Sequence, residues 1–126
     1  MPYHLRMDGD LLRCDFHGTF TSADLARMGE EINALERAQA VVPDRLTDLS
    51  GASVAELDYG AISALANRRR QSVIKNKVRS AVVGATPLHY GLARMYQMLN
   101  DHPMIELRVF SSQAEALEWI RQPRNP

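Results

Sequence analysis

Segments typical of β-strands alternate with segments typical of amphipathic helices through most of this chain, and no other feature constrains its fold as strongly. Strands are predicted at residues 45–49, 78–85 and 105–110, where apolar residues run together or alternate with polar ones. A helical pattern follows each of them. This order predicts right-handed crossover connections and parallel pairing of the strands that they join.

The chain begins with a predicted hairpin. Residues 3–8 and 11–17 have the pattern of strands, and Asp8-Gly9-Asp10 lies between them. Glycine readily adopts the positive φ that a tight hairpin turn requires. We expect the first strand to be antiparallel to the second, which ends at Gly18, and the later strands to be parallel to the second.

Four helices are predicted from their capping signals and apolar spacing. They run from about residue 22 to 38, from 57 or 58 into a basic run, from 87 to about 99, and from 113 to about 121. The signals at their starts are Thr21 with Asp24, Asp58, Thr86 followed by Pro87, and Ser112 with Glu115.

Residues at helical spacing predict the buried face of each helix. They are Leu25, Met28, Ile32 and Leu35 in the first helix, Ile62, Leu65, Ala66 and Arg69 in the second, Leu88, Leu92, Met95 and Leu99 in the third, and Leu117 and Ile120 in the last. Glu36, Tyr90 and Arg94 are predicted to lie off these faces.

The predicted fold class is α/β, with the order β-β-α-β-α-β-α-β-α. A mixed, mostly parallel five-stranded sheet is covered by four helices. The chain has 126 residues, enough for one domain, which we assign to residues 1–121. Residues 122–126 are polar and rich in proline, and we expect them to form a flexible tail.

Composition restricts the partners and the compartment. Net charge is zero, but residues 1–67 carry 5 basic and 11 acidic side chains, and residues 68–126 carry 10 basic and 4 acidic ones. Because the basic run from Arg68 to Arg79 has no interleaved aromatic residues, nucleic-acid binding is not predicted. No apolar segment reaches the length of a membrane span. The single cysteine, Cys14, excludes an intrachain disulfide and fits the cytoplasm, where we expect the protein.

The run from Asp48 to Gly60 carries the most distinctive motif. Asp48-Leu-Ser-Gly follows a predicted strand, and Asp58-Tyr-Gly opens the next helix. Together with the element order, this run resembles the STAS domain, which includes bacterial anti-sigma-factor antagonists of the SpoIIAA type. YGLARMYQ at residues 90–97 and RVF to EALEWI at residues 108–120 look more like the SpoIIAA-like branch of that superfamily. The resemblance implies the SpoIIAA/STAS fold and a regulatory domain that docks a partner through this run.

One position departs from the pattern of the family. In place of Asp-Ser-Ser/Thr-Gly this chain has Asp58-Tyr59-Gly60, so a tyrosine stands where partner kinases phosphorylate a serine. A serine kinase does not act on a tyrosine hydroxyl. The resemblance therefore implies a docking protein without the serine phospho-switch, unless Ser50 or Ser53 has taken over that role.

Candidate binding residues gather around this run and on the third helix. They are Asp48, Ser50, Ser53, Val54, Asp58, Tyr59, Tyr90 and Arg94. Asp48 ends a predicted inner strand, where open α/β sheets place their ligands, and Tyr90 and Arg94 would flank a small anionic or lipid ligand beside it. The alternative is structural: Asp48 and Asp58 would satisfy donors in a turn and a helix cap, and Tyr90 would pack beside a solvated Arg94.

No catalytic or metal motif accompanies these residues. The four histidines lack the spacing of metal ligands, and neither Ser50 nor Ser53 has a base near it in the sequence. We therefore expect no enzyme, no metal and no cofactor.

Two functions are left open. The first is a non-enzymatic interaction domain for a regulatory protein, with a homodimer as one arrangement. The second is a small-ligand or lipid-binding module with a pocket between the second and third helices, for an anionic or apolar ligand. A cavity lined by Tyr90, Tyr96 and methionines would favour the ligand, whereas an exposed apolar patch near Val54 and Leu57 would favour a partner.

Overall fold

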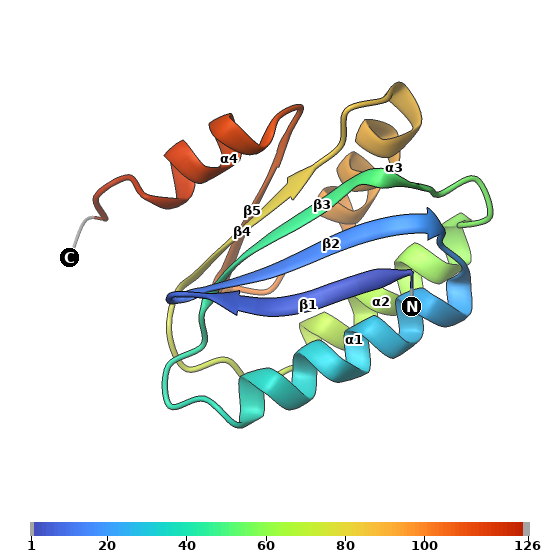
Figure 1. The fold of residues 1–126 in the computed structure, drawn as a ribbon. Coiled ribbons are helices and arrows are strands. Elements are labelled where there is room, and N and C mark those ends of the chain that lie inside the picture. Colours follow the sequence, from blue (N-terminus) through green and yellow to red (C-terminus); the bar gives the residue numbers. More distant parts are fainter. Residues whose placement is uncertain (1, 125–126) are drawn as a thin grey trace.

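The computed structural model describes residues 2–124, which form one five-stranded sheet and four helices (Figure 1). The strands are β1 (Tyr3–Asp8), β2 (Leu11–Thr19), β3 (Asp44–Ser53), β4 (Val78–Val83) and β5 (Ile105–Phe110). The helices are α1 (Ser22–Arg37), α2 (Tyr59–Arg70), α3 (Pro87–Leu99) and α4 (Gln113–Ile120). The predicted element order is confirmed.

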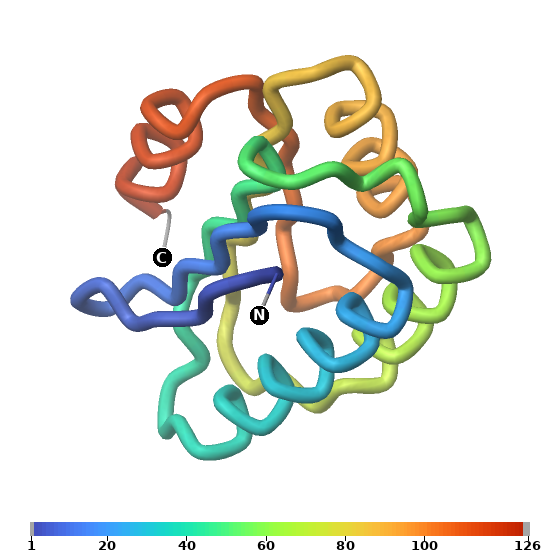
Figure 2. Tube along the Cα trace, turned by 45° about the vertical axis from the view of Figure 1, so that its right-hand side comes forward, coloured from blue at the N-terminus to red at the C-terminus, as the bar shows by residue number. Residues whose placement is uncertain are grey.

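Strand order in the sheet follows chain order, β1-β2-β3-β4-β5. β1 pairs antiparallel with β2, and each later pair is parallel, as predicted. Because each crossover adds the next strand at the same edge, connections of one hand place α1, α2 and α3 on one face of the sheet. α4 follows the last strand and covers the other face, apart from the other three helices (Figure 1 and Figure 2).

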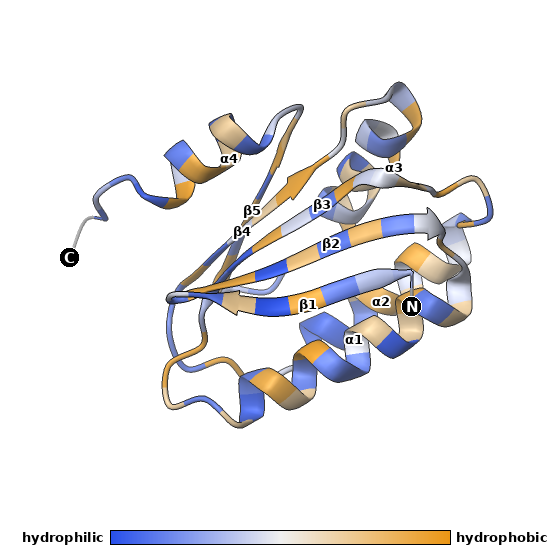
Figure 3. Ribbon diagram, viewed as in Figure 1, coloured by the Kyte–Doolittle hydropathy of each residue, from blue (hydrophilic) through white to orange (hydrophobic). Residues whose placement is uncertain are grey.

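Each face of the sheet has its own hydrophobic core. Successive side chains of a strand point to opposite faces, and Figure 3 shows apolar and polar residues alternating along β2. Phe16 and Ile32 belong to the core between the sheet and α1, α2 and α3, whereas Leu46 and Trp119 belong to the core under α4. Cys14 is buried in the first of these cores.

The helix starts agree with the predicted capping residues. The Thr21 hydroxyl accepts a hydrogen bond from the Asp24 backbone N–H, and the Asp24 carboxylate accepts one from the Thr21 backbone N–H. Asp58, Thr86 and Ser112 accept the equivalent backbone hydrogen bonds in α2, α3 and α4. Each cap satisfies an N–H group that has no partner within its helix.

The predicted end of the third strand at residue 49 is wrong, because β3 continues to Ser53. β2 also continues past Gly18, and its last residues pair with β3 beyond an irregularity between Asp15 and His17. The close approach of the two strands requires a glycine at position 51, since a Cβ atom there would lie 2.5 Å from the backbone oxygen of Phe16. β4 is shorter than predicted and ends at Val83.

α3 is rotated relative to its predicted buried face. Leu88 is 51% exposed, whereas His89 is buried together with Leu92 and Ala93. The His89 ring lies 2.8 Å from the Thr86 hydroxyl and 2.7 Å from the Ala52 carbonyl oxygen, and these hydrogen bonds draw that side of the helix toward β3. A periodicity of apolar residues does not detect a core position that a histidine occupies.

α4 differs in a similar way. Its fully buried residues are Ala116, Trp119 and Ile120, and Leu117 is only partly buried. The large Trp119 ring turns the helix toward the sheet, and Phe110 packs against it with ring centroids 5.6 Å apart.

The described part of the predicted tail contacts the domain. The Gln122 carbonyl oxygen accepts a hydrogen bond from Arg79 Nη1 at 2.9 Å, and Arg124 forms an ion pair with Asp44. Residues 125 and 126 lie outside the described residues, so a flexible tail stays a prediction.

Candidate functional site

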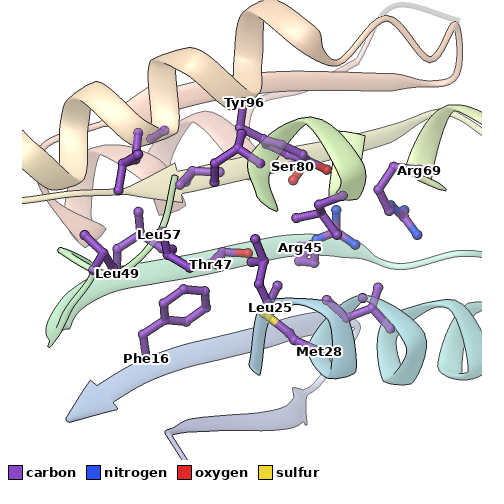
Figure 4. A pocket seen from close by; sticks show the side chains of 18 residues that line it. Phe16, Leu25, Met28, Arg45, Thr47, Leu49, Leu57, Arg69, Ser80 and Tyr96 are labelled. Atoms are coloured by element: carbon purple, nitrogen blue, oxygen red, sulfur yellow. The ribbon is translucent and has the colours of Figure 1, made fainter. Parts of the chain in front are cut away.

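A cavity of about 70 Å³ lies between the sheet and helices α1, α2 and α3. Its wall is mostly apolar and is formed by β2, β3, β4, the segment after β3 and the three helices (Figure 4). The lining residues are Phe16, Leu25, Met28, Gly29, Ile32, Arg45, Thr47, Leu49, Val54, Leu57, Ile62, Leu65, Arg69, Ser80, Val82, Leu92, Ala93 and Tyr96. An apolar wall with a few polar groups is the usual composition of a small-ligand site.

The apolar end of the cavity lies where the chain leaves β3. Figure 4 shows Phe16, Leu49 and Leu57 at this end, far from the labelled arginines. Val54 is also part of the wall and is 1% exposed. A hydrogen bond of 3.0 Å from the Leu57 N–H to the Val54 carbonyl oxygen closes the turn between them. The segment after β3, within the run from Asp48 to Gly60, is therefore part of the cavity wall.

Two buried arginines form the other end of the cavity. Arg45 lies near the start of β3 and is 5% exposed, and Arg69 lies in the last turn of α2 and is 2% exposed. Because alternate residues of a strand face the same side, Thr47 follows Arg45 into the cavity, while Leu46 packs under α4. The Ser80 side chain on β4 lies in the same wall.

Glu36, at the end of α1, pairs with both arginines. Its carboxylate accepts hydrogen bonds from Arg69 Nη1 at 2.6 Å and from Nη2 at 3.0 Å, which makes a bidentate pair. Arg45 Nη1 makes one longer contact, 3.4 Å, to the same carboxylate. Glu36 is 8% exposed and is not among the described residues that line the cavity. The prediction that it lies off the buried face of the helix is wrong.

The cluster of Glu36, Arg45 and Arg69 combines two positive charges with one negative charge. Burial lowers the pKa of Arg45, Arg69 lowers it further, and Glu36 raises it. Arg45 stays protonated, because arginine is not deprotonated in proteins. Among the described residues, Arg69 Nε is buried without a hydrogen-bond partner. The arginine end of the cavity therefore has an excess of positive charge.

Asp48 lies on the opposite face of the sheet. Its carboxylate accepts hydrogen bonds from the Ser50 backbone N–H at 2.9 Å and from Gln113 Nε2 at 2.6 Å. Gln113 in turn accepts one from Arg13 Nη2 at 2.8 Å. Asp48 thus ties the start of α4 to the sheet, in agreement with the structural alternative. The side chains of Ser50 and Ser53 are exposed near the end of β3.

The remaining candidate residues surround the cavity without entering it. Asp58 caps α2 by accepting the Ala61 backbone N–H at 2.9 Å. Tyr59 is 59% exposed, and Tyr90 and Arg94 are exposed on α3. Among the described residues that line the cavity, Val54 is the one candidate named from the sequence.

Sequence reasoning did not select the arginine end of the cavity, although one signal pointed to it. Glu36 follows Ile32 by four residues and Met28 by eight, so it continues the buried stripe of α1. A carboxylate at such a position requires a buried partner. Arg69 was placed on the buried face of its helix, and that prediction is confirmed. Arg45 carried no comparable signal, because it stands next to Asp44 and Pro43 at the start of a strand.

Cys14 does not provide a reactive thiol. Its sulfur is buried 3.5 Å from Met28 Sδ, and burial raises the pKa of the thiol to about 12. The thiolate, which is the nucleophilic form, is therefore scarce near neutral pH.

Residues 2–124 contain neither a metal-binding cluster nor a membrane-spanning helix. This part of the chain contains no cluster of histidine, cysteine, aspartate and glutamate side chains suited to a metal ion. None of its helices combines the length and the apolar character that crossing a membrane requires.

The whole domain is similar to a solved structure. That structure is an uncharacterised protein of the DUF3478 family from Shewanella loihica PV-4, whose crystal structure has a SpoIIAA-like fold. The similarity covers 94% of this chain and 91% of that chain, with a TM-score of 0.56 and 18% sequence identity. No protein-family model and no curated protein matches the sequence. The chain therefore has the SpoIIAA-like fold that its motifs implied.

Proposed function

We propose that the protein is a non-enzymatic binding module that takes a small, largely apolar ligand into the cavity between the sheet and α1, α2 and α3. The observation that carries this proposal is the cavity of about 70 Å³ itself, which lies within an otherwise packed core. A single water molecule needs roughly 10–15 Å³ of such space, so the cavity has room for a group of several atoms.

The character of the wall favours binding over catalysis. Histidine, cysteine, aspartate and glutamate are missing from the described residues that line the cavity. The hydroxyls of Thr47 and Ser80 thus have no general base beside them within this wall, and a hydroxyl needs one to act as a nucleophile. The same wall supplies apolar contact area and a few hydrogen-bonding groups, which are what a ligand requires.

Filling the cavity tests the proposal. Ala93 is 3% exposed and lines the cavity, so Ala93→Leu would place three more carbon atoms where the ligand binds. The probe is 1-octanol, an uncharged eight-carbon chain. We expect it to raise the melting temperature of the wild-type protein in a dose-dependent way and to have little effect on Ala93→Leu.

Ala64→Leu is the matched control, because Ala64 is exposed on the outer side of α2. It adds the same atoms away from the cavity and should respond to 1-octanol like the wild type. A wild-type protein that fails to respond, or an Ala93→Leu variant that responds equally, would contradict the proposal.

Docking of a regulatory protein is the second candidate function, and the exposure of Tyr59 favours it. This side chain is 59% exposed at the start of α2, and Ser50 and Ser53 are exposed near the end of β3. The segment between β3 and α2 also forms part of the cavity wall through Val54 and Leu57. A ligand in the cavity would therefore contact the segment that presents the docking surface.

Tyr59→Ser is the variant that tests docking. Val54→Asp is unsuitable, because Val54 is 1% exposed and a carboxylate there would disrupt folding. Loss of a captured partner on Tyr59→Ser, with an unchanged melting temperature, would support docking.

The missing phospho-switch is tested by incubating the wild-type protein with ATP and an anti-sigma-type serine kinase and then measuring its intact mass. We expect no added phosphate on the wild type.

A further inference from the structure

We infer that the ligand is a monocarboxylate with an aliphatic chain, whose carboxylate is held by Arg45 with help from Arg69; this rests on the proposed function of the cavity. The aliphatic chain would lie toward Leu49 and Leu57, at the opposite end. Three observations lead to this class of ligand: the charge of the buried cluster, its geometry and the apolar remainder of the wall.

The charge of the cluster calls for one more negative charge. Two guanidinium groups that are 5% and 2% exposed share the single carboxylate of Glu36. Among the described residues, no other carboxylate forms an ion pair with either arginine. A buried charge is costly unless it is paired. One monoanion in the cavity would complete the pairing, whereas a dianion would exceed it.

The geometry leaves Arg45 available to a ligand. Glu36 occupies both terminal nitrogens of Arg69 at 2.6 and 3.0 Å, but it reaches Arg45 only through Nη1 at 3.4 Å. Arg45 and Arg69 are both lining residues of the cavity, and Glu36 is not among its described lining residues. Arg45 therefore keeps donors that Glu36 does not occupy, and its planar guanidinium matches a carboxylate in bidentate geometry.

The rest of the wall defines the rest of the ligand. Beyond the arginines, Thr47, Ser80 and Tyr96 are the polar residues of the described lining, and the other lining residues are apolar. The wall near Phe16 and Leu57 suits an alkyl chain and offers no further charge to bind. An amphiphile with one small anionic head therefore fits both ends.

Four probes with the same alkyl chain separate the alternatives in titration calorimetry of the wild-type protein at pH 7. They are octanoate, 1-octanol, octylammonium and octyl phosphate. We expect octanoate to bind at least about tenfold more tightly than 1-octanol, because one charge-assisted hydrogen bond strengthens binding by about that factor. Octylammonium should bind more weakly than 1-octanol. Octyl phosphate should bind more weakly than octanoate, because its head is larger and more charged.

The outcomes distinguish this inference from the proposed function. If 1-octanol binds as tightly as octanoate, the carboxylate inference is wrong and the binding module stands. If none of the four probes binds, the proposed function itself is wrong. If octyl phosphate equals or exceeds octanoate, the site takes phosphorylated amphiphiles and the monocarboxylate is excluded.

Variants of the cluster test which residue holds the carboxylate. Arg45→Gln should weaken octanoate binding by about tenfold to a hundredfold and leave the affinity for 1-octanol unchanged. Glu36→Gln should strengthen octanoate, because it removes the internal competitor for the two arginines. A variant that merely disturbed the fold would bind both octanoate and 1-octanol more weakly. Weaker octanoate binding in Arg45→Gln and stronger octanoate binding in Glu36→Gln would therefore identify an effect of charge.

Arg94→Gln is the matched control, since Arg94 is exposed and is not among the described residues that line the cavity. It should leave the octanoate affinity unchanged. If Arg45→Gln does not fold, Arg45→Lys keeps the charge and loses the bidentate geometry, and octanoate binding should weaken while 1-octanol binding persists. Unchanged octanoate affinity in a folded Arg45 variant, or weakened octanoate affinity in a folded Glu36→Gln variant whose 1-octanol affinity is unchanged, would overturn the inference.

Discussion

The two faces of the sheet are filled in different ways. Under α4, Leu46 and Ala81 are completely buried and share a core with Trp119, and the nearby Asp48 is hydrogen-bonded to Gln113. On the other face, three helices leave a cavity of about 70 Å³, and two arginines share one carboxylate beside it. β3 contributes alternate residues to both faces. A single strand, β3, therefore supports a closely packed face and a face suited to a ligand.

The largest expected effect comes from the buried charges. Glu36→Gln should lower the free energy of unfolding by about 3–5 kcal/mol, because it leaves two buried arginines without a counter-charge. On the other face, Asp48→Asn should cost only about 1 kcal/mol, since Asp48 is partly exposed and the amide oxygen can still accept one of the two hydrogen bonds. Urea denaturation measures both. Equal losses in the free energy of unfolding for the two variants would contradict this difference between the faces.

Truncation of one leucine on each face compares their packing. Leu46 is 0% exposed and surrounded on all sides, whereas Leu92 already borders the cavity. Truncation of a buried leucine to alanine typically lowers the free energy of unfolding by ~2–5 kcal/mol. The loss for Leu46→Ala should lie near the upper limit of this range. The loss for Leu92→Ala should lie near the lower limit, because the Leu92 side chain gives up fewer contacts. A larger loss for Leu92→Ala in the same urea experiment would show that the helix face is the tighter one.

Helix capping gives a smaller difference between the faces. Thr86→Ala should cost ~1 kcal/mol, because the hydroxyl accepts the His89 backbone N–H at 3.2 Å and also contacts the His89 ring. Ser112→Ala at the start of α4 removes a backbone cap of 3.3 Å and a hydrogen bond of 3.4 Å to the Glu115 carboxylate, and should cost less because both are exposed to solvent. Thermal unfolding followed by circular dichroism measures which of the two variants loses more stability. A larger loss for Ser112→Ala would show that the His89 contact adds nothing.

The smallest effect at neutral pH concerns Cys14. Its pKa is raised by burial from 9.0 to about 12, so in this interval the unfolded chain releases a proton that the folded chain keeps. Stability from this group is complete below pH 9 and is lost as the pH rises toward 12. At pH 10 the loss relative to pH 8 should be about 1 kcal/mol. Cys14→Ala should lack this component, and identical pH dependence in both proteins would contradict the burial of the thiol.

The fold was largely predictable from the sequence because its signals are local. Thr86-Pro87 and Ser112 with Glu115 fix helix starts within a few residues, and the order of elements then dictates parallel pairing. The predicted end of the third strand at residue 49 was wrong for a non-local reason, because β3 continues through Gly51 to Ser53. Gly51 is needed where β2 passes close to β3, and no neighbour in sequence reveals that contact.

The candidate site was predictable only in part, because it combines residues that lie far apart in sequence. Glu36, Arg45 and Arg69 come from α1, β3 and α2 and meet only after the sheet has formed. The family motif directed attention to Asp48, whose side chain points to the other face of the sheet. Val54, from the same run, is one of the candidate binding residues, and it lies in the cavity wall and not on an exposed patch.

The comparison of the two faces is tested most directly by methyl nuclear magnetic resonance of the wild-type protein titrated with octanoate. The account predicts shifts of the methyl signals of Val54, Ile62 and Leu92, which line the cavity, while those of Leu46 and Ala116 under α4 stay in place. Shifts confined to the methyl groups under α4, or no shifts at saturating octanoate, would contradict it.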